Sequence, residues 1–282
     1  MPMHQIQIDC PPIEWLYVPN VEYHQYGTVS RKLQMIVPFG TDKTFPLIVY
    51  LPGSAFYRQE MYLGVPQFAR LARRGYVVAA LQYRESEIAK FPAQVQDVHN
   101  AISFLKEKAS DFHIDPDKIF LMGHSSGGYN ALMAGLTTGL PEFDGGANHR
   151  IRGVVPMSAP CCLKFEMGMT VPGKVSYDPN DYRPELDMLG LARFEDDPPL
   201  CLRARPDTYV APDRPIPPIA LIHGYQDSVV HINNSRKFYE SLKNCGLRAN
   251  LYEIIGKDHG GAWLWDDQTL DIVDHFFQEA LV

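Results

Sequence analysis

The fold can be read from the stretch Ile119-Phe120-Leu121-Met122-Gly123-His124-Ser125-Ser126-Gly127-Gly128. Its first four residues predict a buried strand, and residues 129–134 beyond it are compatible with a helix. A serine flanked by glycines between a strand and a helix is typical of a nucleophile elbow, and the helix N-terminus behind it favours developing negative charge. The pattern indicates Ser125 as the nucleophile. Ser126 is the weaker candidate, because His124 would then occupy the position that needs a small residue.

Short apolar runs alternate with helical patterns along most of the chain. Helical spacing of apolar residues is found in three segments. They are residues 92–108, a segment that contains Phe238 and Leu242 and that Gly246 would end, and a terminal segment from Leu270 to Leu281. The strand-like runs are residues 45–51, 76–81, 118–122, 153–157, 218–223 and 249–255, with 31–37 nearer a sheet edge. Strands alternating with helices predict a three-layer α/β/α sandwich with about eight strands, mostly parallel.

One region interrupts this alternation. Residues 160–217 are rich in Pro, Asp, Arg and Met, and only a segment around 184–194 has a convincing helical pattern. Long irregular segments in compact domains are commonly lids or binding elements. We therefore expect residues 1–282 to form a single domain, with a small cap inserted at about 160–217.

A serine nucleophile needs a base, and the base needs an orienting acid. For an elbow of this type the expected order along the chain is serine, acid, histidine, each after its own strand. Asp227 follows the predicted strand 218–223, and His259 follows the predicted strand 249–255. Asp258 is an alternative acid, although a sequence neighbour is poorly placed to reach the Nδ1 atom of His259. His124 and His223 are interpreted as structural.

The segment after the strand 45–51 is Pro52-Gly53-Ser54-Ala55-Phe56, whose small residues would let main-chain N–H groups approach a substrate carbonyl. We expect the oxyanion hole to consist of the N–H of Ser126 with that of Ser54 or Ala55. Phe56 and Trp263 are candidates for contact with the substrate. For Trp263, packing under the terminal helix is an equal alternative.

Several motifs together resemble the esterase/lipase branch of the α/β-hydrolases. They are Pro52 to Phe56, Gln82-Tyr83-Arg84, Phe91-Pro92-Ala93, Asp97, Gly123 to Gly128, His223-Gly224-Tyr225-Gln226-Asp227 and Asp258-His259-Gly260. The chain resembles bacterial feruloyl- and acetylxylan-esterase-like enzymes, which are related to prolyl-oligopeptidase catalytic domains, over about residues 22–280. It departs from that family where Pro52-Gly53-Ser54 replaces the usual His-Gly-Gly, so a side-chain role of the family histidine is not carried over.

The bulk composition excludes several classes of function. The 282 residues carry a formal net charge of −7 without a basic run, which argues against a nucleic-acid partner. No apolar run approaches the roughly 20 residues of a membrane helix, and residues 1–5 do not resemble a secretory signal. The five cysteines, an odd number without C-x-x-C spacing, favour reduced thiols in the cytoplasm. No metal or organic cofactor is implied, and the oligomeric state, a homo-oligomer included, stays open.

These features predict a serine carboxylesterase that acts on a small-molecule ester through an acyl-enzyme. The mixed, proline-broken composition of 160–217 favours a short or aromatic acyl group on a hydrophilic alcohol, such as an acetylated or feruloylated carbohydrate. Two alternatives stay open. A serine exopeptidase of the prolyl-oligopeptidase type would need acids to bind a free amino terminus, for which Glu195-Asp196-Asp197 is the candidate. A non-catalytic binding protein on the same fold is the other.

Overall fold

The computed structural model describes residues 4–8, 13–162 and 183–282 and is built around an eight-stranded sheet. The strand order is β1-β2-β4-β3-β5-β6-β7-β8. β1 pairs with β2 and β2 with β4 in antiparallel fashion, and all later neighbours are parallel. The strands are β1 (Glu14–Tyr26), β2 (Val29–Phe39), β3 (Phe45–Leu51), β4 (Val77–Leu81), β5 (Ile114–His124), β6 (Ile151–Met157), β7 (Ile219–Gly224) and β8 (Ala249–Ile254).

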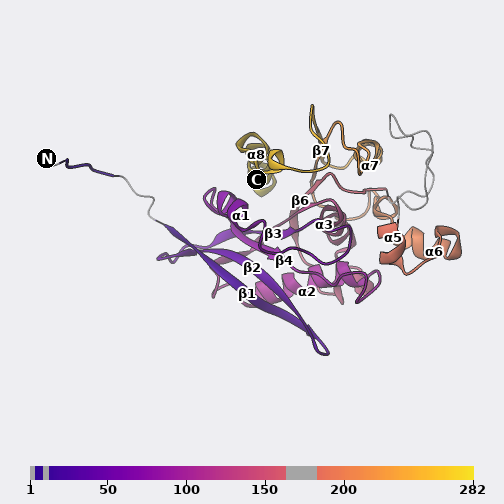
Figure 1. Cartoon of the computed structure of the whole chain (residues 1–282), viewed down its shortest axis with the longest axis horizontal. Coiled ribbons are helices and arrows are strands. Elements are labelled where there is room, and N and C mark those ends of the chain that lie inside the picture. Colours follow the sequence, from indigo (N-terminus) through magenta and orange to yellow (C-terminus); the bar gives the residue numbers. More distant parts are fainter. Residues whose placement is uncertain (1–3, 9–12, 163–182) are drawn as a thin grey trace.

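Helices cover both faces of this sheet, which makes the expected three layers (Figure 1). α1 (Val65–Ala72) and α8 (Asp267–Leu281) pack on one face, and α2 (Ala93–Glu107), α3 (Ser126–Thr137) and α7 (Asn233–Asn244) pack on the other. The central strand β5 shows why its residues are apolar throughout. Ile119 and Leu121 belong to the core under α2 and α3, whereas Phe120 and Met122 belong to the core under α8.

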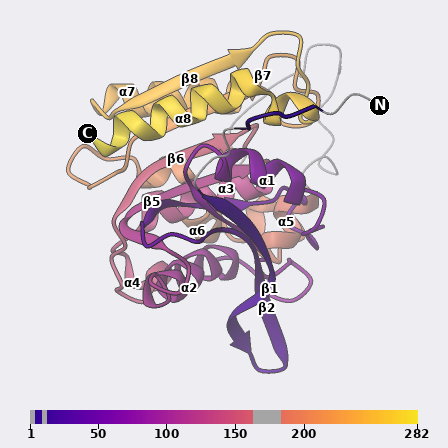
Figure 2. The same cartoon turned by 90° about the vertical axis from the view of Figure 1, so that its left-hand side faces the viewer.

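The long β1–β2 hairpin extends beyond the rest of the sheet (Figure 2). The sequence indicates β2 but not β1, because most β1 side chains are exposed and the pairing register shifts between Val18 and Val21. The helix α1 was also not predicted, since its 8 residues are too few for a distinct periodic pattern.

The inserted region lies between β6 and β7, as predicted. Its described part contains α5 (Arg183–Leu189) and α6 (Pro198–Arg203), and a short 3-10 turn lies on either side of α6. The short helix α4 (Pro141–Asp144) precedes β6 and is not part of the insertion. The helix expected around 184–194 ends earlier, because Gly190 adopts φ 76°. Residues 163–182 of the expected cap lie outside the described part of the chain.

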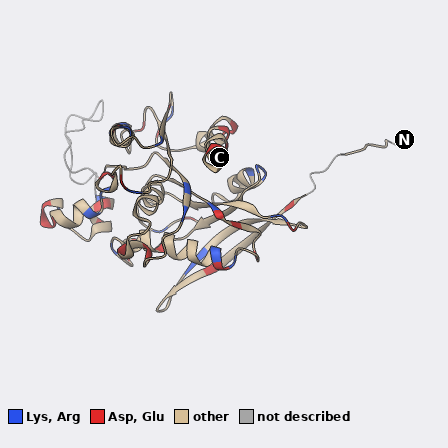
Figure 3. Ribbon diagram, turned by 180° about the vertical axis from the view of Figure 1, so that it is seen from behind, with Lys and Arg blue, Asp and Glu red and all other residues tan. Residues whose placement is uncertain are grey.

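Charges of both signs are intermixed along the ribbon in the view of Figure 3. Within the described residues, no helix combines the length and the apolarity needed to cross a bilayer. Arg84 and Asp97 form an ion pair, with Nη2 of Arg84 2.7 Å from Oδ1 of Asp97, which ties the segment after β4 to α2.

Candidate active site

The turn between β5 and α3 holds Ser125 in a backbone conformation that few residues adopt. Ser125 has φ 55° and ψ −125°, and a positive φ costs a non-glycine residue of the order of 1–3 kcal/mol. Its N–H donates to the carbonyl oxygen of Met157 at 2.8 Å, and its own carbonyl accepts from the N–H of Tyr129 at 3.0 Å. β6 and the first turn of α3 therefore hold the strained residue in place.

Two glycines allow the segment after β3 to approach this turn. A Cβ atom on Gly127 would lie 2.0 Å from the carbonyl oxygen of Leu51. A Cβ atom on Gly53 would lie 2.8 Å from the carbonyl oxygen of His124 and 3.0 Å from Cβ of Ser125. Both approaches are tighter than van der Waals contact allows, so any larger residue would force the two loops apart.

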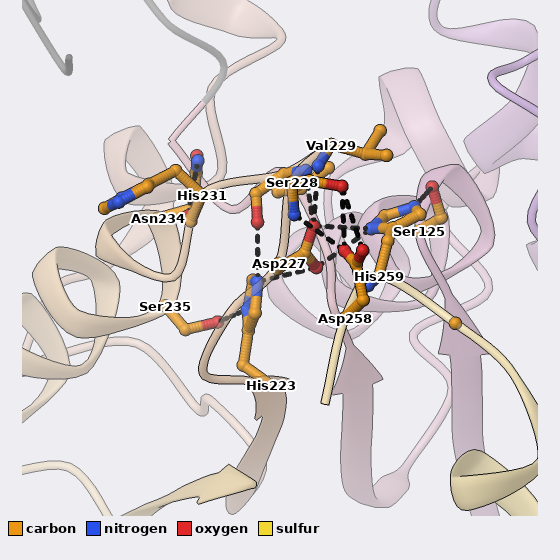
Figure 4. A network of polar contacts seen from close by, with 12 residues as sticks. Ser125, His223, Asp227, Ser228, Val229, His231, Asn234, Ser235, Asp258 and His259 are labelled. Carbon is orange, nitrogen blue, oxygen red and sulfur yellow. Dashed lines mark hydrogen bonds and ion pairs between the residues drawn. The ribbon is translucent and has the colours of Figure 1, made fainter. Parts of the chain in front are cut away.

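The side chains of Ser125, His259 and Asp227 form a continuous hydrogen-bonded chain (Figure 4). Nε2 of His259 lies 2.9 Å from Oγ of Ser125. Nδ1 of His259 lies 2.9 Å from Oδ2 and 3.1 Å from Oδ1 of Asp227. Because an ionised carboxylate only accepts, Nδ1 carries the proton and Nε2 offers its lone pair to the hydroxyl. This geometry allows the imidazole to take the serine proton as the oxygen attacks.

The carboxylate of Asp227 is buried and surrounded by donors. Oδ1 accepts from the main-chain N–H groups of Val229 at 3.0 Å and Val230 at 2.8 Å. Oδ2 lies 3.1 Å from Nε2 of His223. Burial by itself would raise the pKa of the Asp227 carboxyl, but the hydrogen bonds from His223 and His259 outweigh it and hold the pKa well below its ordinary value. Asp227 therefore stays ionised while it faces the imidazole.

The neighbouring acid, Asp258, makes a different set of contacts. Its Oδ1 accepts from the N–H of Ser228 at 2.8 Å, from the hydroxyl of Ser228 at 2.9 Å and from the N–H of His259 at 2.7 Å. These bonds join the loop after β8 to the loop after β7. The imidazole of His259 instead contacts the carboxylate of Asp227 through Nδ1. Of the two acids that the sequence offers, Asp227 is the one placed to orient the ring.

His124 supports the same loop from the side of β5. Its Nε2–H donates to the carbonyl oxygen of His259 at 2.6 Å, and the two rings lie 4.9 Å apart. Burial lowers the pKa of the His124 imidazole to about 4, so the ring is neutral near pH 7 and has one N–H to donate. This contact agrees with a structural interpretation of His124, which fixes the backbone of His259.

The loop after β3 carries two of the main-chain N–H groups considered for the oxyanion hole, those of Ser54 and Ala55. The N–H of Ser54 donates to Oγ of Ser126 at 2.9 Å, and the buried hydroxyl of Tyr83 lies 3.0 Å from Oγ of Ser54 and 3.2 Å from Oγ of Ser126. Ala55 and Phe56 follow with φ 52° and 64°. Two consecutive strained residues persist only where surrounding contacts fix them. The N–H of Ser54 is thus already engaged, which favours Ala55 of the two alternatives.

The two residues expected to contact the substrate lie in the core. Phe56 is 1% exposed and packs edge-on against Tyr129 with ring centroids 5.3 Å apart. Trp263 is 8% exposed, belongs to the core under α8, and donates its Nε1–H to the carbonyl oxygen of Gly260 at 2.9 Å. Little of either ring is exposed, which favours the packing alternative for Trp263 and leaves contact of Phe56 with the substrate a prediction.

The described part of the insertion contacts the loop after β3 and the start of α3. The hydroxyl of Tyr57 donates to Oδ2 of Asp187 at 2.7 Å, and the hydroxyl of Tyr129 donates to the carbonyl oxygen of Ala204 at 2.6 Å. The acids considered for binding an amine have local roles instead: Asp196 accepts from the N–H of Arg193, and Asp197 accepts from the N–H of Leu200 at the start of α6. Such capping is the ordinary use of an aspartate before a helix.

The family of the chain follows from a comparison with family models. The model of the BD-FAE family matches residues 33–242, which include Ser125 and Asp227. The chain belongs to the BD-FAE family. His259 lies beyond the matched segment, and its assignment to the site rests on the distances to Ser125 and Asp227 given above.

Individual relatives of this BD-FAE member are esterases. Esterase LipQ of Mycobacterium tuberculosis is 26% identical over 222 residues, which cover 76% of this chain and 49% of that protein. The chain spans about half the length of the curated relatives it matches. Among solved structures, a truncated carbohydrate esterase from gut microbiota superposes with a TM-score of 0.79 at 25% identity, covering 94% of this chain and 96% of that one. Butyrate-bound esterase Est2 of Thermogutta terrifontis superposes with 0.72 at 25% identity, covering 93% and 94%.

Sequence reasoning missed how the BD-FAE site is supported behind its three central side chains. No local sequence pattern reveals these supporting contacts, because their partners are distant in sequence. They are the hydrogen bond that Oγ of Ser126 accepts from Ser54, the contact of the Tyr83 hydroxyl with Ser126, and the contact of Ser235 with His223. Among residues 4–8, 13–162 and 183–282, no group of three or more His, Cys, Asp and Glu side chains could hold a metal ion.

Proposed function

We propose that this BD-FAE member is a serine carboxylesterase that works through an acyl-enzyme. The observation that carries the proposal is the hydrogen-bonded chain from Asp227 through His259 to Ser125, with 2.9 Å at each of its two shortest contacts. Ser125 is partly exposed at the carboxyl end of β5, which would let a substrate carbonyl approach it. The family match and the esterases among the relatives support the same activity.

In the proposed reaction, Oγ of Ser125 attacks the ester carbonyl while Nε2 of His259 takes its proton. The imidazolium so formed is stabilised by the ionised Asp227, and it returns the proton to the leaving alcohol as the C–O bond breaks. Water then attacks the acyl-enzyme with the same histidine as base. Each step needs the tautomer that the Asp227 contact selects.

We further propose that the oxyanion hole consists of the main-chain N–H groups of Ala55 and Ser126. The N–H of Ser126 begins α3, where helix geometry leaves it without an intrahelical partner. The N–H of Ser54, the third candidate, is held by Oγ of Ser126. Donors fixed before the substrate arrives stabilise the developing oxyanion without reorganisation.

For the substrate, we propose short or aromatic acyl esters of a hydrophilic alcohol, such as acetylated or feruloylated carbohydrates. The carbohydrate esterase with the TM-score of 0.79 and the butyrate-bound esterase support this class. The described part of the insertion adds polar groups near the loop after β3, among them Asp187 on Tyr57. A lipase would need a broad apolar surface there instead.

We also propose that the chain forms one catalytic domain with residues 160–217 as its cap, and that it resides in the cytoplasm. The insertion site between β6 and β7 supports the first statement. Free thiols at Cys161, Cys162, Cys201 and Cys245 support the second.

The experiment that tests the proposed function is a rate series on aryl esters of increasing acyl length, measured beside aminoacyl amides. We expect the highest kcat/KM at about two to four acyl carbons and a steep loss beyond about eight, because each added methylene must fit a closed pocket. Amide cleavage at rates comparable to the esters would instead support the exopeptidase alternative. Fastest turnover of long-chain esters in emulsion would contradict the carbohydrate-ester class.

A further inference from the structure

A second buried histidine lies behind the acid of the site, on the side away from His259 (Figure 4). The side chains of His223 and Asp227 are both 0% exposed, with Nε2 of His223 3.1 Å from Oδ2 of Asp227. Nε2 is also 2.7 Å from the carbonyl oxygen of Val230. The other ring nitrogen, Nδ1, lies 2.7 Å from Oγ of Ser235 on α7. Because both side chains are removed from solvent, the contact between His223 and Asp227 is weakly screened.

The partners of His223 determine where its proton lies. The carbonyl oxygen of Val230 and the carboxylate of Asp227 can only accept, so Nε2 must carry a hydrogen that both share. The hydroxyl of Ser235 can donate, and in the neutral ring it donates to Nδ1. The acceptors at Nε2 therefore select the neutral tautomer that presents an N–H to Asp227, and Ser235 supports it by donating to Nδ1.

The same contact also fixes the turn that carries the acid. The N–H of Val230 donates to Oδ1 of Asp227, while the carbonyl of Val230 accepts from His223. His223 thus holds both the carboxylate and the turn behind it. Oδ2 receives its two donors from two imidazoles, His259 at 2.9 Å and His223 at 3.1 Å. Without His223, Oδ2 of Asp227 would keep His259 as a donor but lose the second donor that helps to hold the carboxylate in this orientation.

We propose that His223 is a positioning residue of the reaction, which keeps Asp227 turned toward His259 and is itself supported by Ser235. The inference rests on the proposed serine-esterase function and adds to it a role that acts through the acid rather than on the substrate. His223 then affects the chemical step and leaves substrate binding unchanged. A histidine that served only to fill the core would affect stability alone.

The test compares three substitutions at the same position. His223→Leu removes the donor. His223→Gln places an amide N–H close to the position of Nε2, and His223→Asn retains an amide that is too short to reach Asp227. We expect kcat on a short-chain aryl ester to fall by about 10- to 100-fold in the Leu and Asn variants, the cost of a buried hydrogen bond to a charged group. KM should change less than about twofold, and Gln should recover most of kcat. Ser235→Ala should cost only a few-fold, since Val230 and Asp227 still favour the same tautomer.

A second readout does not depend on turnover. The hydrogen-bonded Nδ1 proton of His259 should give a low-field proton NMR signal that is absent in His259→Ala. We expect His223→Leu to shift or broaden this signal and His223→Gln to preserve it, in variants that circular dichroism shows to be folded. An unchanged signal and a kcat within twofold of wild type in folded His223→Leu, or equal losses in the Leu and Gln variants, would overturn the inference.

The outcomes separate this inference from the proposed function. If wild type hydrolyses esters in a Ser125-dependent way and His223→Leu is fully active, only the positioning role fails. If Ser125→Ala retains the wild-type rate, the proposed function fails, and the NMR comparison still decides whether His223 orients Asp227.

Discussion

Replacing Asp227 by asparagine tests the orientation of the site most informatively, because it keeps the shape of the side chain. The asparagine oxygen would take the position of Oδ1, where the N–H groups of Val229 and Val230 donate. Its NH₂ group would then face Nδ1 of His259 at 2.9 Å and Nε2 of His223 at 3.1 Å. An NH₂ group cannot accept, so His259 would have to move its proton to Nε2, where it blocks proton transfer from Ser125.

The magnitude follows from the loss of both the tautomer and the anion. We expect kcat to fall by about 10⁴-fold, which corresponds to about 5 kcal/mol of barrier. The matched control is Asp258→Asn. Its oxygen can still accept from the N–H groups of Ser228 and His259, so we expect a loss of less than about tenfold.

The assay is the initial rate of aryl-ester hydrolysis by both variants, at saturating substrate and near neutral pH. Thermal melting establishes that each variant is folded. A loss of 10⁴-fold in Asp258→Asn with a minor effect in Asp227→Asn would refute the assignment, since the acid would then be Asp258. Equal, small losses in both would show that the orientation of His259 does not limit the reaction.

Three further predictions concern the surroundings of the site. Gly127→Ala should destabilise the fold by about 1–3 kcal/mol or more and reduce activity, because the new Cβ would lie 2.0 Å from the carbonyl oxygen of Leu51. Urea unfolding measures the loss of stability, and an unchanged midpoint would contradict the prediction. Ser126→Ala should lower kcat/KM about tenfold, since the N–H of Ser54 loses its acceptor; steady-state kinetics with unchanged organophosphonate labelling of the serine nucleophile would support this. Burial raises the pKa of Glu185 to about 7. Because ionising this carboxyl costs the folded state, the cost is absent below about pH 4.5 and complete above about pH 7. Glu185→Gln should therefore raise the free energy of unfolding near pH 8, by at most about 3 kcal/mol, and leave it unchanged near pH 4; equal effects at both pH values would exclude this origin.

Hydrophobic periodicity predicts seven of the eight strands, and the glycine-flanked serine between a strand and a helix predicts the nucleophile. Residues 45–51 coincide with β3, and residues 92–108 exceed α2 by one residue at each end. The reason is that strands covered on both faces must be apolar throughout, as β5 is. The edge strand β1 has no such constraint, since its side chains are mostly exposed, and its sequence gave no comparable signal.

The order of Ser125, Asp227 and His259 could also be predicted, because each follows a strand whose carboxyl end meets the same sheet edge. The sequence favours Asp227 over Asp258 but does not decide between them. The choice depends on which carboxylate the loops turn toward the ring of His259. Phe56 shows the same limit. Its positive φ directs the side chain into the core against Tyr129, and residue type alone does not specify that direction.

The central claim is that Ser125 is the nucleophile of an esterase, and the most direct measurement is covalent labelling with an organophosphonate followed by peptide mapping. We predict stoichiometric modification of Ser125 alone, with parallel loss of ester hydrolysis, and neither labelling nor turnover in folded Ser125→Ala. Modification of Ser126 or of another residue, or wild-type turnover by Ser125→Ala, would contradict the account.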